Sequence, residues 1–195
     1  MHKVSAQDPG DWRIDRSSGR LAAARQLPSP NQDARPDPTD IDLLILHGIS
    51  LPPGNFGGPW IADLFLNRLE ATADPYFATI HTLRVSAHLL VRRDGGLIQF
   101  VPFHRRAWHA GASCWQGRGR CNDYSIGIEL EGTDDMPYDA RQYQTLKWLL
   151  PAIRAAYPAI SPDRIVGHSD VAPGRKTDPG AAFDWSRLRQ DGAMN

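Results

Sequence analysis

Residues 41–49 have the sequence IDLLILHGI, and this stretch decides the class of fold. It is a short, nearly continuous aliphatic run bounded by turn-forming residues, which is typical of a strand that is buried on both faces. A strand of this kind lies in a sheet whose two faces are both packed against other elements. The run therefore predicts an inner strand of a covered sheet, and it places His47 at the end of that strand.

A second strand is predicted over residues 125–131 (SIGIELE), where apolar residues occupy every other position. Since side chains alternate across a strand, one face carries Ile126, Ile128 and Leu130 and the other carries Gly127, Glu129 and Glu131. Two interpretations of the second face stay open at this point. It is either a solvent-facing surface, or Glu129 is a general base on a rigid strand, with Gly127 leaving room for substrate beside it.

The other elements alternate between strands and helices without strict regularity. Further strands are predicted over residues 85–92, 97–102 and 164–167, the first two joined by a glycine turn at 93–96. Helices are predicted over residues 60–69, 139–157 (kinked or split at Pro151) and 184–189, and long loops over 51–59 and 103–124. The pattern favours an α/β fold with a mixed central β-sheet flanked by helices.

The length of 195 residues predicts one domain. The first 40 residues are rich in Pro, Asp, Arg and Ser, which is typical of irregular structure. We therefore expect an irregular N-terminal leader over residues 1–22, the domain over residues 23–190, and a short tail over residues 191–195.

Composition argues against several classes of partner. With 22 Lys and Arg against 22 Asp and Glu, the chain lacks the basic excess of a broad nucleic-acid surface. No apolar run approaches the roughly 18 residues that span a bilayer, and the N-terminus lacks a signal peptide's apolar core. The two cysteines, Cys114 and Cys121, make neither a disulfide scaffold nor a CxxC zinc ribbon. We expect a cytoplasmic protein without nucleic-acid or membrane partners.

Candidate metal ligands lie at the ends of predicted strands. His47 and His168 each end a strand, and Asp178 follows His168 by ten residues. Two imidazoles and one carboxylate leave a fourth position for water, the pattern of catalytic zinc. Each histidine taken alone also fits a hydrogen-bonded polar group at a strand end, and the spacing between His47 and His168 is no local motif. Lys176, two residues before Asp178, is a compact charge suited to an oxyanion or a phosphate.

Other histidines and nucleophiles fit less well. His88 lies mid-strand and is interpreted as structural, whereas His109 lies in the loop-rich stretch and is a candidate for substrate contact. Residues 167–170 (GHSD) hold the letters of a serine triad, but neighbours on an extended chain point apart. The chain has no GxSxG elbow, so serine hydrolysis is disfavoured.

Five longer motifs resemble one enzyme family. They lie at residues 51–60 (LPPGNFGGPW), 83–88 (LRVSAH), 106–111 (RAWHAG), 121–133 (CNDYSIGIELEGT) and 175–180 (RKTDPG). Together they resemble the cytoplasmic AmpD-type 1,6-anhydro-N-acetylmuramyl-L-alanine amidases, over residues 23–188. The resemblance implies the amidase-2 fold, which is shared with peptidoglycan recognition proteins.

The resemblance also implies roles for individual residues. The implied zinc ligands are His47, His168 and Asp178, and the implied catalytic groups are the Glu129 carboxylate and the Lys176 ammonium. Arg84 and Arg120 match arginines that line the substrate groove, and Trp108 and His109 are expected to form a wall for the sugar, although Trp108 also fits plain core. Gly48 stands where the family usually has Asn, so we expect a weaker grip on the substrate there.

The implied reaction is zinc-dependent cleavage of the amide between anhydromuramic acid and L-alanine in muropeptides recycled from the cell wall, with an indirect influence on β-lactamase induction. The alternative is a non-catalytic module that binds peptidoglycan or muropeptides. We expect a monomer whose partner is its anhydromuropeptide substrate.

Overall fold

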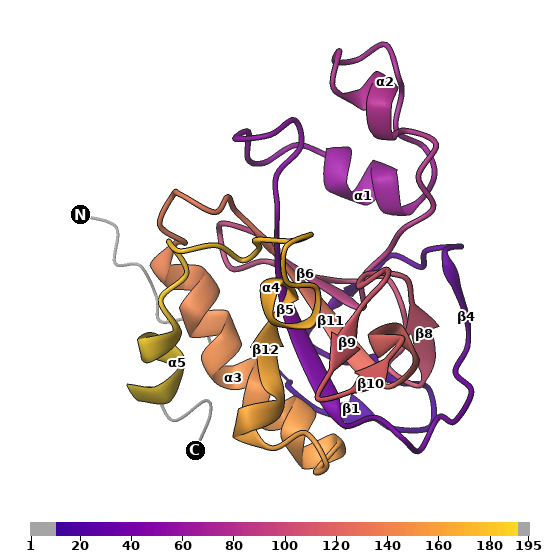
Figure 1. Cartoon of the computed structure of the whole chain (residues 1–195), viewed down its shortest axis with the longest axis vertical. Coiled ribbons are helices and arrows are strands. Elements are labelled where there is room, and N and C mark those ends of the chain that lie inside the picture. Colours follow the sequence, from indigo (N-terminus) through magenta and orange to yellow (C-terminus); the bar gives the residue numbers. More distant parts are fainter. Residues whose placement is uncertain (1–10, 191–195) are drawn as a thin grey trace.

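The computed structural model describes residues 11–190, and its centre is a six-stranded mixed sheet (Figure 1). The strand order is β12-β5-β11-β6-β7-β3. These strands are β3 (Arg25–Gln26), β5 (Leu43–Ile49), β6 (Leu89–Val91), β7 (Leu97–Gln99), β11 (Ser125–Glu131) and β12 (Ile165–Gly167). Strands β12, β5, β11 and β6 are parallel, and β6 and β7 form the predicted antiparallel hairpin. The mixed sheet confirms the predicted fold class.

The two long inner strands, β5 and β11, are covered on both faces. The even-numbered apolar side chains of both strands pack with α3 (Ala140–Ala156), which runs along one face of the sheet together with α5 (Trp185–Gln190). On the opposite face, Leu43 and Ile45 of β5 pack against Val171 of α4 (His168–Val171). The alternation predicted for residues 125–131 is therefore confirmed, and its second face is buried rather than solvent-facing.

Helix α3 begins with a capping box and continues past Pro151. The Asp139 carboxylate accepts a hydrogen bond from Arg141 N at 2.9 Å, and the Gln142 side chain accepts one from Asp139 N at 3.0 Å. Of the predicted kink or split at Pro151, the split is wrong, since one helix spans residues 140–156, and the kink stays a prediction. Pro151 is exposed, and the fully buried Leu150 and Ile153 on either side of it hold this part of the helix to the sheet.

Two short helices form a projecting lobe at the top of Figure 1. They are α1 (Trp60–Phe65) and α2 (Phe77–Ile80). Helix α1 is shorter than predicted because the chain turns at Asn67, whose φ of 58° is left-handed. The lobe packs through Leu64, Phe65 and Phe77 onto apolar residues of β6 and β7. It thus lies above one end of the sheet.

The N-terminal part of the domain differs from the irregular leader predicted over residues 1–22. Residues 1–10 lie outside the described part, but β1 (Ile14–Asp15) and β2 (Arg20–Leu21) form an antiparallel pair, and Leu21 is fully buried in the core. The two-residue strand β2 is too short to show a period-2 pattern in the sequence. The domain boundaries stay a prediction, and the tail over residues 191–195 also lies outside the described part.

The stretch predicted as a loop over residues 103–124 contains short strands. β8 (Arg105–Ala107) pairs with β4 (Gln32–Ala34), and β9 (Cys114–Trp115) pairs with β10 (Arg118–Gly119). Two 3-10 turns, η1 (Cys121–Asp123) and η2 (Pro162–Arg164), precede β11 and β12. Within residues 11–190, no helix is long and apolar enough to span a bilayer.

Candidate active site

Three candidate ligands meet at the carboxyl ends of neighbouring parallel strands. His47 lies near the end of β5, His168 directly follows β12, and Asp178 lies in the loop after α4. Because Gly167 of β12 is level with Leu46 of β5, the two histidines are brought side by side. The carboxyl ends of strands in an open α/β sheet are where ligand sites form.

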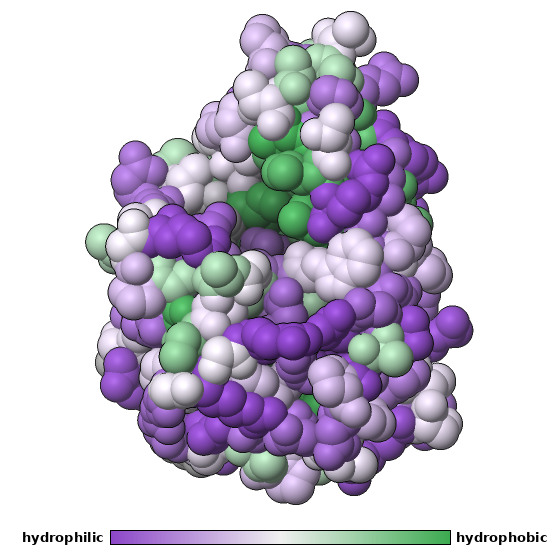
Figure 2. All heavy atoms as spheres, turned by 45° about the vertical axis from the view of Figure 1, so that its right-hand side comes forward, coloured by the Kyte–Doolittle hydropathy of each residue, from purple (hydrophilic) through white to green (hydrophobic). Residues whose placement is uncertain are grey.

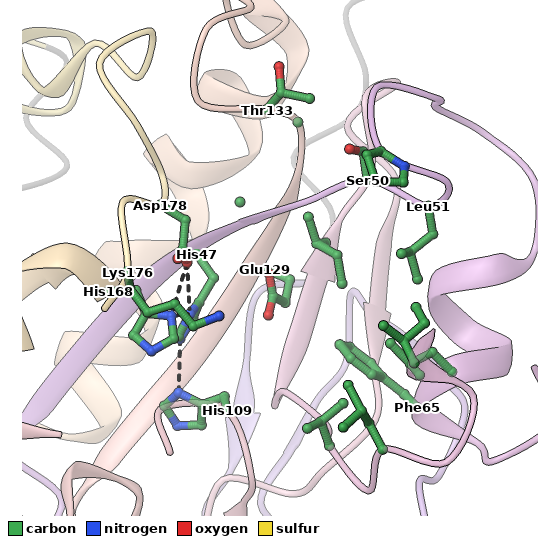
Figure 3. Close-up of a pocket in the computed structure, with 18 of the residues that line it drawn as sticks. His47, Ser50, Leu51, Phe65, His109, Glu129, Thr133, His168, Lys176 and Asp178 are labelled. Atoms are coloured by element: carbon green, nitrogen blue, oxygen red, sulfur yellow. Dashed lines mark hydrogen bonds and ion pairs between the residues drawn. The ribbon is translucent and has the colours of Figure 1, made fainter. Parts of the chain in front are cut away.

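The distances between the three side chains suit a single metal ion. His47 Nδ1 lies 2.9 Å from His168 Nδ1 and 3.2 Å from Asp178 Oδ2, and His168 Nδ1 lies 3.1 Å from the same oxygen (Figure 3). The ligand atoms all lie within 4.8 Å of one another. Two imidazole nitrogens and a carboxylate oxygen that face one point form a ligand set typical of zinc.

Burial and hydrogen bonding favour the charge states that a metal requires. Burial lowers the pKa of His47 to about 4, so its imidazole is neutral at pH 7. Burial opposes ionisation of Asp178, but hydrogen bonds from His168 and His47 outweigh it and hold the pKa of this carboxyl below its usual range. The cluster therefore holds a neutral His47 imidazole and an ionised Asp178 carboxylate, the charge states in which these groups bind a metal.

Glu129 lies next to the cluster on the adjacent strand. It is level with His47 across the β5–β11 pair, and only 9% of its surface is exposed. Its Oε2 is buried and has no hydrogen-bond partner among residues 11–190. Burial, with a smaller contribution from Asp178, raises the pKa of Glu129 well above its ordinary value. An orphaned carboxylate oxygen facing a ligand cluster is placed to exchange a proton with a molecule bound there.

A pocket of about 610 Å³ opens in front of these groups. Figure 2 shows it as a hollow between the lobe and the body of the molecule, with apolar side chains on the lobe side. Its polar wall includes the ligand cluster, Glu129 and Lys176. Its apolar wall includes Leu51, Leu64, Phe65, Ile80, Leu83 and Val85. In Figure 3 the Lys176 side chain extends past the histidines towards the space in front of Glu129.

Of the other predicted site residues, the structure brings three to the pocket. Trp108, His109 and Gly48 line it, whereas Arg84 and Arg120 are not among its described lining residues. Arg84 is exposed and donates to the carbonyl of Thr82, within its own segment. Arg120 is three-quarters exposed and pairs with Asp123 at 2.9 Å. The groove role of the two arginines stays a prediction.

Side chains of the protein pack closely against both Gly48 and Gly127. A Cβ at Gly48 would overlap the Tyr138 hydroxyl, which donates a hydrogen bond to the Pro179 carbonyl at 2.9 Å. The space of an Asn side chain is thus already filled from within the protein. The prediction that Gly127 leaves room for substrate is wrong, because the His109 ring packs against it.

Several residues that support the site were assigned no role from the sequence. The Asn122 amide oxygen accepts hydrogen bonds from the backbone of residues 109 and 110, and Arg175 donates to the Ala110 carbonyl. Glu131, predicted on the face of Glu129, accepts hydrogen bonds from the backbone N–H groups of Gly57 and Arg93. Glu131 thereby fixes the loop beside Leu51. These contacts join distant segments, so only the folded chain reveals them.

The mixed sheet carries a site of histidine, aspartate and glutamate side chains at its strand ends. Comparison with known proteins identifies this arrangement as that of an amide hydrolase. Residues 37–181 match the Amidase_2 family, N-acetylmuramoyl-L-alanine amidase, and the chain belongs to this family. The protein is therefore an enzyme that hydrolyses the amide bond between N-acetylmuramic acid and L-alanine.

The similarity extends over most of the chain. It is 58% identical to the 1,6-anhydro-N-acetylmuramyl-L-alanine amidase AmpD of Citrobacter freundii, over 88% of this chain and 91% of the relative. A crystal structure of a selenomethionine AmpD derivative has a TM-score of 0.87 and 57% identity, over 89% of this chain and 97% of that chain. The Escherichia coli amidase AmiD, solved with the substrate anhydro-N-acetylmuramic acid-L-Ala-D-γ-Glu-L-Lys, has a TM-score of 0.58 and 36% identity over 78% of this chain and 58% of that chain.

Proposed function

We propose that the protein is a zinc-dependent amidase that cleaves the bond between 1,6-anhydro-N-acetylmuramic acid and L-alanine in muropeptides released from the cell wall. The observation that carries the proposal is the buried, unpartnered Glu129 Oε2 beside His47, His168 and Asp178. The AmpD relatives, whose printed name gives this substrate, support the choice of the anhydro sugar.

The three ligands fit zinc by their chemistry and spacing. His47 and His168 would each contribute Nδ1, and Asp178 would contribute Oδ2, which leaves a fourth position that faces the pocket. When bound there, zinc supplies a Lewis acid that polarises a carbonyl and lowers the pKa of a coordinated water. Proton transfer and stabilisation of the developing charge are carried out by side chains of the protein.

Glu129 acts as the proton carrier. Burial, with a smaller contribution from Asp178, raises the pKa of Glu129, so its carboxylate is a stronger base than that of an exposed glutamate. It accepts a proton from the attacking water and then delivers that proton to the nitrogen of L-alanine as the amide bond breaks. The strand on which it lies keeps its position fixed relative to His47.

Lys176 stabilises the charge that develops on the scissile carbonyl oxygen. An ammonium donates hydrogen bonds and offers no lone pair, so Lys176 takes no part in holding the metal. Its side chain extends towards the space in front of Glu129 (Figure 3), and its charge lowers the pKa of that carboxyl against the larger effect of burial. Donors aimed at a developing oxyanion are worth roughly 2.7–4 kcal/mol each.

The polar wall and the apolar wall of the pocket would contact different parts of the substrate. The scissile amide would lie on the polar wall, and the apolar wall would accept the less polar face of the sugar and its acyl groups. Trp108 and His109 border the site, and we propose that Arg84 and Arg120 contact carboxylates of the stem peptide through bidentate pairs.

The anhydro sugar also bears on where in the cell the enzyme acts. Because the anhydro sugar marks soluble fragments, we propose that the enzyme acts in the cytoplasm during peptidoglycan recycling, as a monomer. Removing anhydromuropeptides would also remove a signal for β-lactamase induction. A strain that lacks the enzyme should then show raised β-lactamase activity, and unchanged activity there would contradict this part.

Substrate choice tests the function. The purified protein with zinc is incubated separately with soluble anhydromuropeptide and with intact sacculi, and the products are identified by mass. We expect anhydromuramic acid and free peptide from the soluble substrate and little release from sacculi. Preferential digestion of sacculi would overturn the recycling role, and binding without cleavage would identify the protein as a non-catalytic module.

A further inference from the structure

The imidazole of His109 lies behind the ligand His47, on the side away from the metal cluster. His47 directs Nδ1 at the cluster, and its other ring nitrogen, Nε2, lies 2.9 Å from His109 Nδ1 (Figure 3). The two rings meet edge to face, with centroids 5.0 Å apart and planes at 86°. The second nitrogen of His109, Nε2, lies 3.3 Å from the Oγ of the fully buried Ser125. Both nitrogens of His109 thus face protein groups.

Metal binding dictates where the protons on these rings must lie. A metal at the cluster needs the lone pair of His47 Nδ1, so the His47 proton is on Nε2. That N–H can donate to His109 only if His109 Nδ1 is unprotonated, which puts the His109 proton on Nε2, towards Ser125. Every ring nitrogen then has one defined role.

The second ligand is oriented by the next residue along the chain. His168 Nε2 lies 3.2 Å from the Ala110 carbonyl oxygen, so its N–H donates there while Nδ1 faces the cluster. Arg175 donates to the same oxygen at 2.7 Å. Two consecutive residues, His109 by its side chain and Ala110 by its backbone, therefore contact the two ligand imidazoles from behind.

This segment is held in place independently of the ligands. The Asn122 side chain accepts hydrogen bonds from His109 N at 3.2 Å and from Ala110 N at 2.8 Å. The His109 ring packs on Gly127, where any Cβ would overlap it. A segment anchored in this way can fix the orientation of the rings that donate to it.

We propose that His109 is a positioning residue of the metal site, which holds His47 in the tautomer and orientation that bind zinc. The proposal rests on the zinc dependence proposed above. It gives His109 a role other than the sugar wall, since neither ring nitrogen is left to bind substrate. Partners of this kind behind ligating histidines typically change metal affinity by about 10- to 100-fold when they are removed.

Two substitutions of nearly the same shape separate the hydrogen bond from packing. In His109→Asn, the amide oxygen can take the place of Nδ1 as acceptor, whereas His109→Leu has a similar outline and no acceptor. His81→Leu is the control, because His81 follows α2 and its ring hydrogen-bonds to the backbone carbonyls of Phe77 and Ala78 in that helix. Zinc affinity is measured by competition with a chromogenic chelator, and folding by thermal unfolding of the metal-free proteins.

We expect His109→Leu to bind zinc about 10- to 100-fold more weakly than the wild type, and His109→Asn and His81→Leu to stay close to it. Equal zinc affinity of the Leu and Asn variants would overturn the role of His109 alone. A wild type that binds no zinc would overturn the proposed function and this proposal together.

A measurement on the unsubstituted protein covers the case in which His109→Leu does not fold. The ¹⁵N shifts of the imidazoles in the zinc-loaded wild type report which nitrogen carries a proton. We expect His109 to be protonated at Nε2 and not at Nδ1. Protonation at Nδ1 would overturn the proposal, since that nitrogen could then accept no hydrogen bond from His47.

Discussion

Substituting Gly127 by alanine tests the packing that supports the site. The added Cβ would lie 2.5 Å from His109 Cγ and 2.7 Å from its Cδ2, closer than real Cβ contacts. The His109 ring cannot easily move away, because it is hydrogen-bonded to His47 and its backbone N–H is hydrogen-bonded to Asn122. Either the ring or strand β11 must therefore shift.

The expected cost follows from the size of this overlap. Overpacking a filled core by a methyl group costs about 1–3 kcal/mol. Replacing glycine by alanine also restricts the unfolded chain, which offsets about 0.4–1 kcal/mol of this cost. With the middle of each range, the net loss is roughly 1.3 kcal/mol in the free energy of unfolding, which corresponds to a Tm about 3–5 °C lower for a domain of this size. Displacement of His109 should also weaken zinc binding.

Thermal unfolding of the metal-free protein and zinc titration measure the two effects. Gly119→Ala is the matched control, because its added Cβ meets nothing nearer than the Ser113 carbonyl oxygen at 3.8 Å. We expect the control to keep the wild-type Tm and zinc affinity. A Gly127→Ala protein that matches the control in both measurements would refute this account of the packing.

Three further predictions concern the catalytic groups and the buried histidines. Lys176→Ala should keep its zinc, measured by metal analysis, and lose about 100- to 1000-fold in kcat; a raised KM with normal kcat would instead indicate ground-state binding. Asp178→Ala should lose zinc and activity together, and a zinc-replete variant would exclude this carboxylate as a ligand. Burial and then the Arg35 charge keep the pKa of His88 well below 6.5, so the unfolded chain binds more protons as the pH falls below 6.5. The chelated protein should therefore lose stability from pH 7 to 5, by up to about 1.4 kcal/mol per pH unit for each such histidine, and a flat profile of denaturant unfolding would argue against a neutral buried His88.

The parts of the fold that the sequence predicted are those encoded by local pattern. The aliphatic run of β5, the alternation of β11 and the glycine turn between β6 and β7 each follow from a few neighbouring residues. The helix over residues 185–190 was also predicted to within a residue. Each of these signals lies within the segment itself and does not depend on contacts with distant parts of the chain.

The parts that could not be predicted depend on contacts between distant segments. Leu21 is buried only because β2 lies against the core, and the room beside Gly127 is filled by a ring 18 residues earlier in the chain. The sequence indicated His47, His168 and Asp178 as ligands, and the register of β12 on β5 explains why the two histidines meet. The hydrogen bonds of Asn122 and Arg175 to residues 109 and 110 have no sequence pattern at all.

The rate of amide hydrolysis at known zinc occupancy tests the central claim most directly. Chelated protein is reloaded with zinc in steps, and cleavage of anhydromuropeptide between the sugar and L-alanine is followed by product mass at each step. A site made of His47, His168 and Asp178 predicts a rate that rises in proportion to bound zinc and levels off at one ion per chain. Full hydrolysis by the metal-free protein, or a rate that rises only with a second ion, would contradict it.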